Sequence, residues 1–143
     1  MKGKCLCGDI EYEISGFNGN IYQCHCSLCR RQGGSSSNSG TVVPTTNLVW
    51  LKGQDKVKTW KKDTGFTSSF CQNCGSLVPN VLRGLDYYWV PVGALEDGAY
   101  RVVANLYLGA KATWAAVSPE GARFDTMPDV EAFIDLLHHK VHE

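Results

Sequence analysis

The sequence predicts a mainly β protein that forms one small domain. Three observations lead to this prediction: short segments of alternating apolar and polar residues, frequent Gly, Pro, Asn and Asp residues between them, and helical spacing only near the chain end. The 143 residues are close to the roughly 150 expected of one domain, and 43% hydrophobic residues provide enough apolar surface for one core. A mainly disordered chain is therefore excluded.

The first clear strand pattern follows the first cysteines. Ile10, Tyr12 and Ile14 alternate with two glutamates, so a strand here has one apolar and one acidic face. Further short segments of strand composition lie between turn residues, and they cover 40–43, 47–51, 56–61, 66–70, 87–92 and 101–107.

Two other segments depart from the strand pattern. Residues 33–40 are rich in Gly and Ser, which predicts a flexible loop or, alternatively, a mobile rim over the neighbouring cysteines. Near the chain end, helical spacing i, i+3, i+4 and i+7 connects Val130, Phe133, Ile134 and Leu137. Thr126 and Asp129 are candidate caps for this short C-terminal helix.

Charge and hydropathy exclude two classes of partner. Lys plus Arg and Asp plus Glu each number 14, so there is no basic excess to neutralise a nucleic acid. No apolar run approaches the roughly 20 residues that cross a bilayer, and the first residues do not form a signal peptide. We therefore expect a cytoplasmic protein without a nucleic-acid or membrane partner.

Seven cysteines are the unusual feature of the composition, and an odd number cannot pair fully in disulfides. They lie in three short groups: Cys5 with Cys7, then Cys24, Cys26 and Cys29, then Cys71 with Cys74. Thiols grouped at gaps of one or two residues in a reducing compartment are typical of metal ligands.

The first and third groups together predict a structural zinc site with four thiolates. A turn at Cys71-x-x-Cys74-Gly75 directs two sulfurs to one ion, and Gly75 permits the positive φ of such a turn. Cys5 and Cys7, at i and i+2 of an extended segment, face the same side and supply the other two ligands. A redox pair at Cys71 and Cys74 is the alternative.

The middle group predicts a second site with only three protein ligands. Cys24, Cys26 and Cys29 leave the fourth position of a zinc tetrahedron open for water or substrate, and a substrate thiol would complete it as a reactive thiolate. Such a site carries negative charge, which Arg30 and Arg31 can offset. A second structural zinc, closed by His25 or another side chain, is equally compatible with the spacing.

Three sequence blocks resemble the glutathione-dependent formaldehyde-activating enzyme family, also called the CENP-V/GFA domain family. They are Gly3-x-Cys5-x-Cys7-Gly8-x-Ile10-x-Tyr12, Cys24-His25-Cys26-x-x-Cys29-Arg30 and Phe70-Cys71-x-x-Cys74-Gly75-Ser76, with weaker likeness at Val92-Gly93-Ala94-Leu95 and Lys111-Ala112-Thr113-Trp114. The resemblance covers about residues 1–126, which we expect to form a zinc domain. The C-terminal helix that the spacing predicts, in 127–143, is expected to pack on it. The resemblance also implies an Mss4-like fold: small antiparallel sheets around two zincs, the second catalytic and often weakly held.

The activity that the resemblance implies is addition of glutathione to formaldehyde, a carbon–sulfur lyase reaction in its reverse sense. Arg30 or Lys111 is then a candidate for binding a glutathione carboxylate, and Trp114 for lining the pocket. The other expectation for Trp114, as for Trp50, Trp60 and Trp89, is a place in the core.

Two other functions compete with this enzyme. One is a zinc-stabilised binding module for a protein partner, in which a side chain closes the second site. The other is redox sensing by Cys24, Cys26 and Cys29 after zinc loss. At the chain end, His138, His139 and His142 are expected on a solvated helix, although the first and last can share a helix face. The sequence does not predict an oligomeric state.

Overall fold

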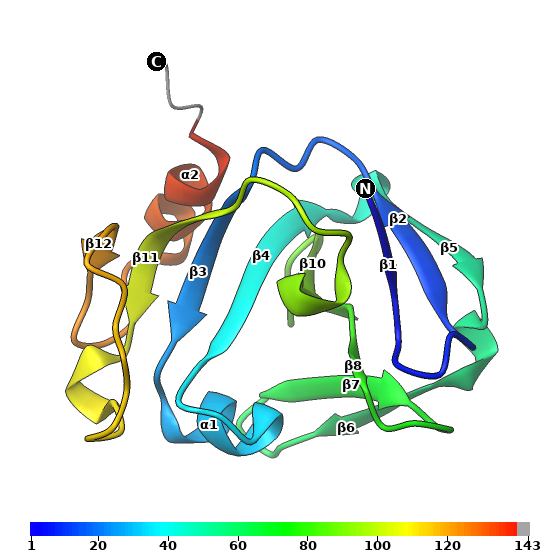
Figure 1. Cartoon of the computed structure of the whole chain (residues 1–143), viewed down its shortest axis with the longest axis horizontal. Coiled ribbons are helices and arrows are strands. Elements are labelled where there is room, and N and C mark those ends of the chain that lie inside the picture. Colours follow the sequence, from blue (N-terminus) through cyan, green and yellow to red (C-terminus); the bar gives the residue numbers. More distant parts are fainter. Residues whose placement is uncertain (140–143) are drawn as a thin grey trace. The chain divides into compact units, whose positions relative to one another are not determined.

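The computed structural model of the protein describes residues 1–139, and strands dominate this part of the chain (Figure 1). The strands are β1 (Lys2–Lys4), β2 (Glu11–Ile14), β3 (Asn20–Cys24), β4 (Asn38–Pro44), β5 (Leu48–Lys52), β6 (Val57–Lys61), β7 (Thr67–Cys71), β8 (Leu77–Val78), β9 (Asn80–Val81), β10 (Tyr87–Pro91), β11 (Arg101–Leu106) and β12 (Ala122–Arg123). The α-helices are α1 (Ser27–Gly33) and α2 (Val130–His138), and short 3-10 helices cover Thr45–Asn47, Gln54–Lys56, Val92–Ala94 and Leu108–Ala110. The prediction of a mainly β protein with a short C-terminal helix is confirmed.

Contacts between Cα atoms divide the chain into two compact units. The first unit joins Met1–Phe17 with Val42–Asp97, and the second joins Asn18–Thr41 with the chain from Gly98 onward. The N-terminal cysteine pair therefore shares a unit with the pair near residue 70, while the middle cysteine group belongs to the other unit. The predicted domain limit at residue 126 stays a prediction.

The first unit contains two three-stranded antiparallel sheets, ordered β1-β2-β5 and β6-β7-β8, and an antiparallel pair of β9 with β10. In β2 the predicted alternation is present, because Tyr12 and Ile14 are buried while Glu13 is exposed. Gly3 of β1 pairs with Tyr12, and a Cβ at this glycine would collide with the tyrosine ring. A side chain at position 3 would therefore separate β1 from β2.

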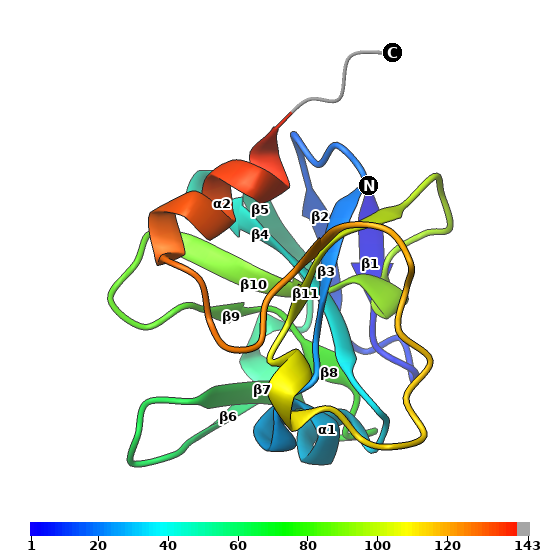
Figure 2. The ribbon, with the colours of Figure 1, turned by 90° about the vertical axis from the view of Figure 1, so that its left-hand side faces the viewer.

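The second unit holds a mixed sheet in the order β12-β11-β3-β4. Strand β11 runs parallel to both β3 and β12, whereas β3 and β4 are antiparallel. Helix α2 packs against β3 and β11 (Figure 2). In this contact the rings of Tyr22 and Phe133 are arranged edge to face, with their centroids 4.9 Å apart. The Asn20 side chain donates a hydrogen bond to the Leu137 carbonyl at 3.0 Å, which fixes the end of the helix to the sheet.

Helix α2 confirms the predicted C-terminal helix and identifies its cap. The Asp129 carboxylate accepts a hydrogen bond from the Ala132 N–H at 3.1 Å, so Asp129 rather than Thr126 is the N-cap. The helix ends at His138 and is followed by His139, whereas His142 lies outside the described residues. No helix among residues 1–139 combines the length and apolar character that crossing a membrane requires.

The Gly- and Ser-rich segment 33–40 is not one long loop, so this prediction is wrong at both ends. Gly33 is the last residue of α1, and Gly34 terminates the helix in the left-handed conformation with φ of 64°. Strand β4 already begins at Asn38. Glycine here therefore ends a helix, and the connecting segment is restricted to residues 34–37.

Candidate metal centres

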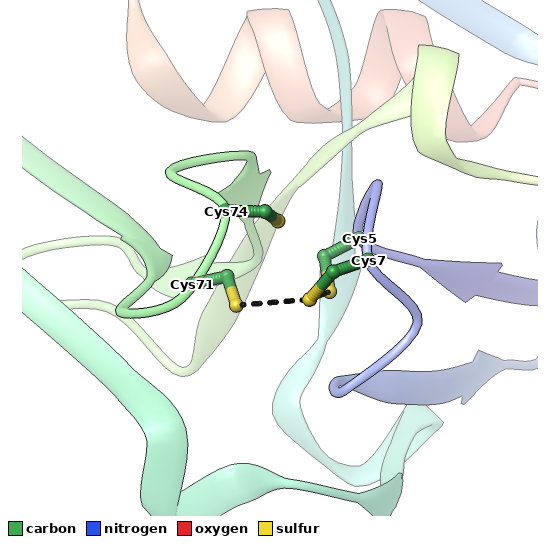
Figure 3. A group of neighbouring side chains, drawn as sticks. All are labelled: Cys5, Cys7, Cys71 and Cys74. Atoms are coloured by element: carbon green, nitrogen blue, oxygen red, sulfur yellow. Dashed lines mark hydrogen bonds between the residues drawn. The ribbon is translucent and has the colours of Figure 1, made fainter.

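Four thiols from two turns of the first unit meet in one cluster (Figure 3). The Sγ atoms of Cys5, Cys7, Cys71 and Cys74 all lie within 4.8 Å of one another. Cys7 is 3.6 Å from Cys5 and 3.8 Å from Cys71, measured between sulfurs. Four sulfurs around a zinc ion at about 2.3 Å are separated by about 3.8 Å, so this donor set fits a tetrahedral zinc site.

Both turns are stabilised by backbone hydrogen bonds and by a glycine. The Gly75 N–H donates to the Cys71 carbonyl at 2.8 Å, and Gly75 has the predicted positive φ, 77°. The Gly8 N–H likewise donates to the Cys5 carbonyl at 3.1 Å, with φ of 80°. Cys5 and Cys7 therefore lie on a turn after β1, and the prediction of an extended segment is wrong. A tight turn brings both sulfurs to one side as effectively as an extended segment.

Two sulfurs of this cluster have hydrogen-bond partners outside it. The Ile10 N–H donates to Cys5 Sγ at 3.3 Å. Cys74 Sγ lies 3.3 Å from the Ser76 hydroxyl oxygen, and hydrogen bonding with Ser76 lowers the pKa of the Cys74 thiol to about 5. Donors directed at sulfur disperse negative charge, which a site with four thiolates requires.

A second, separate cluster of three thiols lies in the second unit. The Sγ atoms of Cys24, Cys26 and Cys29 are within 4.8 Å of one another, and Cys26 is the most exposed of the three. Cys24 ends β3, and Cys26 caps α1 by accepting a hydrogen bond from the Cys29 N–H at 3.3 Å. The strand end and the first helical turn therefore assemble three ligands without residues from elsewhere in the chain.

The three thiols differ strongly in acidity because they hydrogen-bond to one another. Hydrogen bonding from Cys24, and then from Cys29, lowers the pKa of Cys26 to about 2. The same interaction with Cys26 raises the pKa of Cys24 to about 11, and hydrogen bonding with Cys24 raises the pKa of Cys29. The cluster therefore holds one thiolate at neutral pH, which suits it to a cation.

His25 lies between two of these cysteines but does not join their cluster. Its side chain is only 1% exposed, and its backbone N–H donates to the Leu106 carbonyl at 2.9 Å. Both ring nitrogens are buried, and neither belongs to the three-thiol cluster. Burial, followed by the charge of Lys111, lowers the pKa of His25, so the imidazole is neutral. In the described part of the chain, no His, Asp or Glu completes a fourth ligand around the three thiols.

The other predicted site residues lie in the same unit. The Arg30 Nε is buried and has no hydrogen-bond partner among the described residues, whereas Lys111 is exposed. Trp114 is 70% exposed, so the expectation that it belongs to the core is wrong, as it is for Trp60 at 55%. Trp89 is buried as expected.

Tyr107 lies beside the three-thiol cluster and was not predicted from the sequence. Burial, followed by the charges of all three cysteines, raises the pKa of its phenol. It directly follows Leu106, whose Cα pairs with that of Cys24. No sequence signal connects residue 107 with residue 24, because the parallel pairing of β11 with β3 is not visible in either segment alone.

The fold and the two clusters define a β-rich protein with two sulfur-only candidate metal centres. The model of the family described as glutathione-dependent formaldehyde-activating enzyme matches residues 1–110, which include all seven cysteines, and the chain belongs to this family. Membership supports a glutathione-dependent formaldehyde-activating role at the level of the family. The matched range ends immediately before Lys111 and Trp114.

A crystal structure of a protein from Rhodobacter sphaeroides, determined as a structural genomics target, shows the same fold. It matches with a TM-score of 0.57 and 24% identity, over 87% of this chain and 99% of that chain. A search of curated proteins found no match.

Proposed function

We propose that the protein is a zinc-dependent enzyme that captures a thiol and adds it to a small aldehyde. Glutathione or a similar thiol and formaldehyde are the proposed substrates, and the reaction is that of a carbon–sulfur lyase in the direction of synthesis. Family membership supports this class of substrates. Seven free cysteines support a reducing compartment such as the cytoplasm.

The observation that carries the proposal is the difference in ligand number between the two clusters. Cys5, Cys7, Cys71 and Cys74 would hold a structural zinc in a closed set of four. Cys24, Cys26 and Cys29 would hold the second zinc, and the described residues offer no fourth ligand. A site with three protein ligands leaves one position for a substrate.

When bound, zinc supplies Lewis acidity that keeps a captured thiol deprotonated near neutral pH. The chain contributes three sulfurs at fixed separation, and Cys26, the most exposed of them, faces the approach of substrate. The thiolate sulfur attacks the carbonyl carbon, an S–C bond forms, and the π electrons of the carbonyl move to oxygen, which takes up a proton. The product is an S-hydroxymethyl thioether, and no further reactant is needed.

Cationic and aromatic side chains near the cluster are proposed to bind the rest of the thiol. Lys111 is close enough to influence the pKa of His25, and it forms no ion pair among the described residues. Arg30 follows Cys29 in α1, and its buried Nε has no hydrogen-bond partner within residues 1–139. Either cation suits a carboxylate of glutathione, and the exposed ring of Trp114 suits its peptide backbone.

Calorimetric titration of zinc-loaded protein with reduced glutathione tests this proposal, with the Cys26→Ser variant beside the unaltered protein. We expect the unaltered protein to contain two zincs and bind glutathione, and the variant to contain one zinc and bind none. Unchanged thermal unfolding and retention of one zinc show that the variant keeps its fold and its structural site.

Two outcomes would contradict the proposal. Absence of glutathione binding to fully loaded protein would reject glutathione, and absence of binding to smaller thiols as well would favour the binding module. Equal binding by the Cys26→Ser variant would show that the thiol binds elsewhere. If only the unaltered protein binds glutathione, formaldehyde turnover is measured next by exchange NMR, and the rate of the spontaneous reaction is subtracted.

A further inference from the structure

Tyr107 has an unusual backbone conformation for a large side chain. Its φ of 56° and ψ of 42° lie in the left-handed region, and among residues 1–139 every other positive φ belongs to glycine. A residue with a Cβ is disfavoured in this region by contact with the following carbonyl. Such strain tends to occur at functional sites, where the surrounding structure holds the residue in place.

Hydrogen bonds on both sides of Tyr107 hold this conformation. The Tyr107 N–H donates to the Thr126 carbonyl at 3.4 Å, and the Ala110 N–H donates to the Tyr107 carbonyl at 3.0 Å. The next residue, Leu108, donates from its N–H to the Phe124 carbonyl at 3.0 Å. The segment after β12 therefore fixes the backbone at residues 107 and 108, and the direction of the tyrosine side chain follows from it.

The position of Tyr107 in the sheet places it at the three-thiol cluster. Strands β3 and β11 are parallel, and their last residues, Cys24 and Leu106, are paired. The residues that follow parallel strands emerge at the same edge of a sheet, and ligands commonly bind at such edges. The hydrogen bond from the His25 N–H to the Leu106 carbonyl extends this pairing one residue beyond Cys24. Tyr107 is therefore directly beside the segment that carries Cys24 and Cys26.

The phenol of Tyr107 is both accessible and sensitive to the cluster. The residue is partly exposed. The cysteines of the three-thiol cluster are near enough to act on its hydroxyl. A tyrosine phenol keeps its proton near neutral pH. A protonated hydroxyl beside a thiol-binding site can donate a hydrogen bond to the oxygen of a reacting carbonyl.

We propose that Tyr107 is a catalytic residue whose hydroxyl donates a hydrogen bond to the aldehyde oxygen as a thiol adds to the carbonyl carbon. This inference rests on the proposed function and adds Tyr107 to the residues that act in the proposed reaction. The S–C bond forms, the carbonyl π bond breaks, and negative charge develops on the oxygen that faces Tyr107. A proton from water completes the new hydroxyl group, and the proton lost by the thiol goes to water. The phenol keeps its own proton throughout.

The Tyr107→Phe variant tests the proposal because it removes one oxygen and retains the ring. We expect the rate of adduct formation at saturating glutathione, above the spontaneous rate, to fall on the order of 10²-fold, as for loss of an oxyanion donor. Glutathione affinity, measured by calorimetry, should stay within about twofold, since the donor acts only on the aldehyde. Tyr100→Phe is the matched control, because Tyr100 precedes the other end of β11. It should retain the full rate.

A spectroscopic measurement tests the placement of Tyr107 independently of turnover. In protein labelled with ¹³C at tyrosine Cζ, the Tyr107 resonance, assigned by its loss in Tyr107→Phe, should shift when zinc is added to the three-thiol site. The Tyr100 resonance should not shift. An unmoved Tyr107 resonance would overturn the proposal.

Failure of this inference differs from failure of the proposed function. If the unaltered protein binds no thiol, both proposals are rejected. If it binds glutathione and accelerates the addition, but Tyr107→Phe does so equally well, only the role of Tyr107 is rejected. A variant with weakened glutathione affinity and an unchanged maximal rate would show that Tyr107 binds the thiol, which also contradicts the proposal.

Discussion

The two cysteine clusters use the same ligand atom but differ in how the chain brings the sulfurs together. The four-thiol cluster joins turns that are 64 residues apart between Cys7 and Cys71, whereas the three-thiol cluster forms within one segment from Cys24 to Cys29. A metal in the first would close a long loop of the chain, and a metal in the second would close almost none. The first cluster is therefore suited to holding a fold, and the second to exchanging a ligand without disturbing one.

A tyrosine lies beside each cluster, and the two tyrosines differ in exposure and in backbone conformation. Tyr12, in the first unit, is completely buried and its hydroxyl has no hydrogen-bond partner among the described residues. Tyr107, in the second unit, is partly exposed and has a strained backbone. The charge of Cys5 acts on Tyr12, and the charges of three cysteines act on Tyr107. Of the two tyrosines, only Tyr107 is exposed enough to contact a substrate at the proposed site.

The largest expected effect is the loss of a ligand from the four-thiol cluster. Cys71 is completely buried at the end of β7, so Cys71→Ser removes one zinc ligand and leaves three converging thiols. A structural zinc contributes folding free energy directly, and its loss is comparable to the roughly 5–15 kcal/mol that stabilises a domain. We expect the variant to lose cooperative thermal unfolding as followed by circular dichroism.

Cys26→Ser in the other cluster is the control for this prediction. It should retain the unfolding transition of the unaltered protein within a few degrees, because the three-thiol cluster ties together only neighbouring residues. A chelator added in steps should likewise remove the first equivalent of zinc without unfolding. Equal loss of stability in both variants would show that both clusters are structural.

A smaller but still large effect is expected in the reactivity of the three-thiol cluster. With zinc retained only in the four-thiol cluster, Cys26 has a pKa of about 2 and is a thiolate throughout pH 5–8. Its rate of alkylation by iodoacetamide should therefore be nearly independent of pH. An ordinary thiol with a pKa near 8.5 reacts about tenfold faster per pH unit over this range. Mass-spectrometric peptide mapping gives the rate at each cysteine.

Cys24 serves as the internal comparison in the same experiment. Its pKa is raised to about 11, so it should be alkylated later than Cys26 at every pH below 8. A rate at Cys26 that rises tenfold per pH unit would show that the three thiols do not share hydrogen bonds in solution. The same result would remove the argument from thiol acidity for a cation at this cluster and leave only the convergence of its three sulfurs.

The sequence predicted β2, β11 and α2, but it missed β3 and α1 in the second unit. Strand β2 has one buried and one exposed face, which leaves a period of two in the sequence. Strand β3 is buried along almost its whole length, because it lies inside a sheet and under α2, so no alternation marks it. Helix α1 was also missed, since it is short and its N-cap is Cys26 rather than Ser, Thr, Asp or Asn.

The candidate metal ligands could be predicted because zinc imposes its spacing on the sequence. Gaps of one or two residues between cysteines are a local signal, and the structure brings the same seven thiols into the two predicted groups. The surroundings of the clusters leave no such signal. Tyr107 lies near the three-thiol cluster because β11 pairs with β3. The same sheet holds the His25 backbone through its hydrogen bond to the Leu106 carbonyl.

The smallest expected effect concerns the buried tyrosine of the first unit. The Tyr12 hydroxyl is buried without a partner within residues 1–139, so Tyr12→Phe should stabilise the protein by about 1 kcal/mol in urea unfolding at pH 8. Burial, followed by the charge of Cys5, raises the pKa of Tyr12 well above its usual value, so the folded state favours the protonated phenol. That contribution is complete below the unfolded pKa of about 10 and is lost as pH rises towards the folded pKa. At pH 10.5 the stability of the variant relative to the unaltered protein should therefore grow by about 0.8 kcal/mol more, which is the free energy of ionising the phenol in the unfolded chain.

Tyr88→Phe is the matched control in the same unit. The Tyr88 hydroxyl accepts a hydrogen bond from Trp50 Nε1 at 3.4 Å, so this variant should lose stability at pH 8. If Tyr12→Phe also loses stability, the Tyr12 hydroxyl has a partner in solution, such as a buried water, and the contrast between the two tyrosines rests on exposure alone.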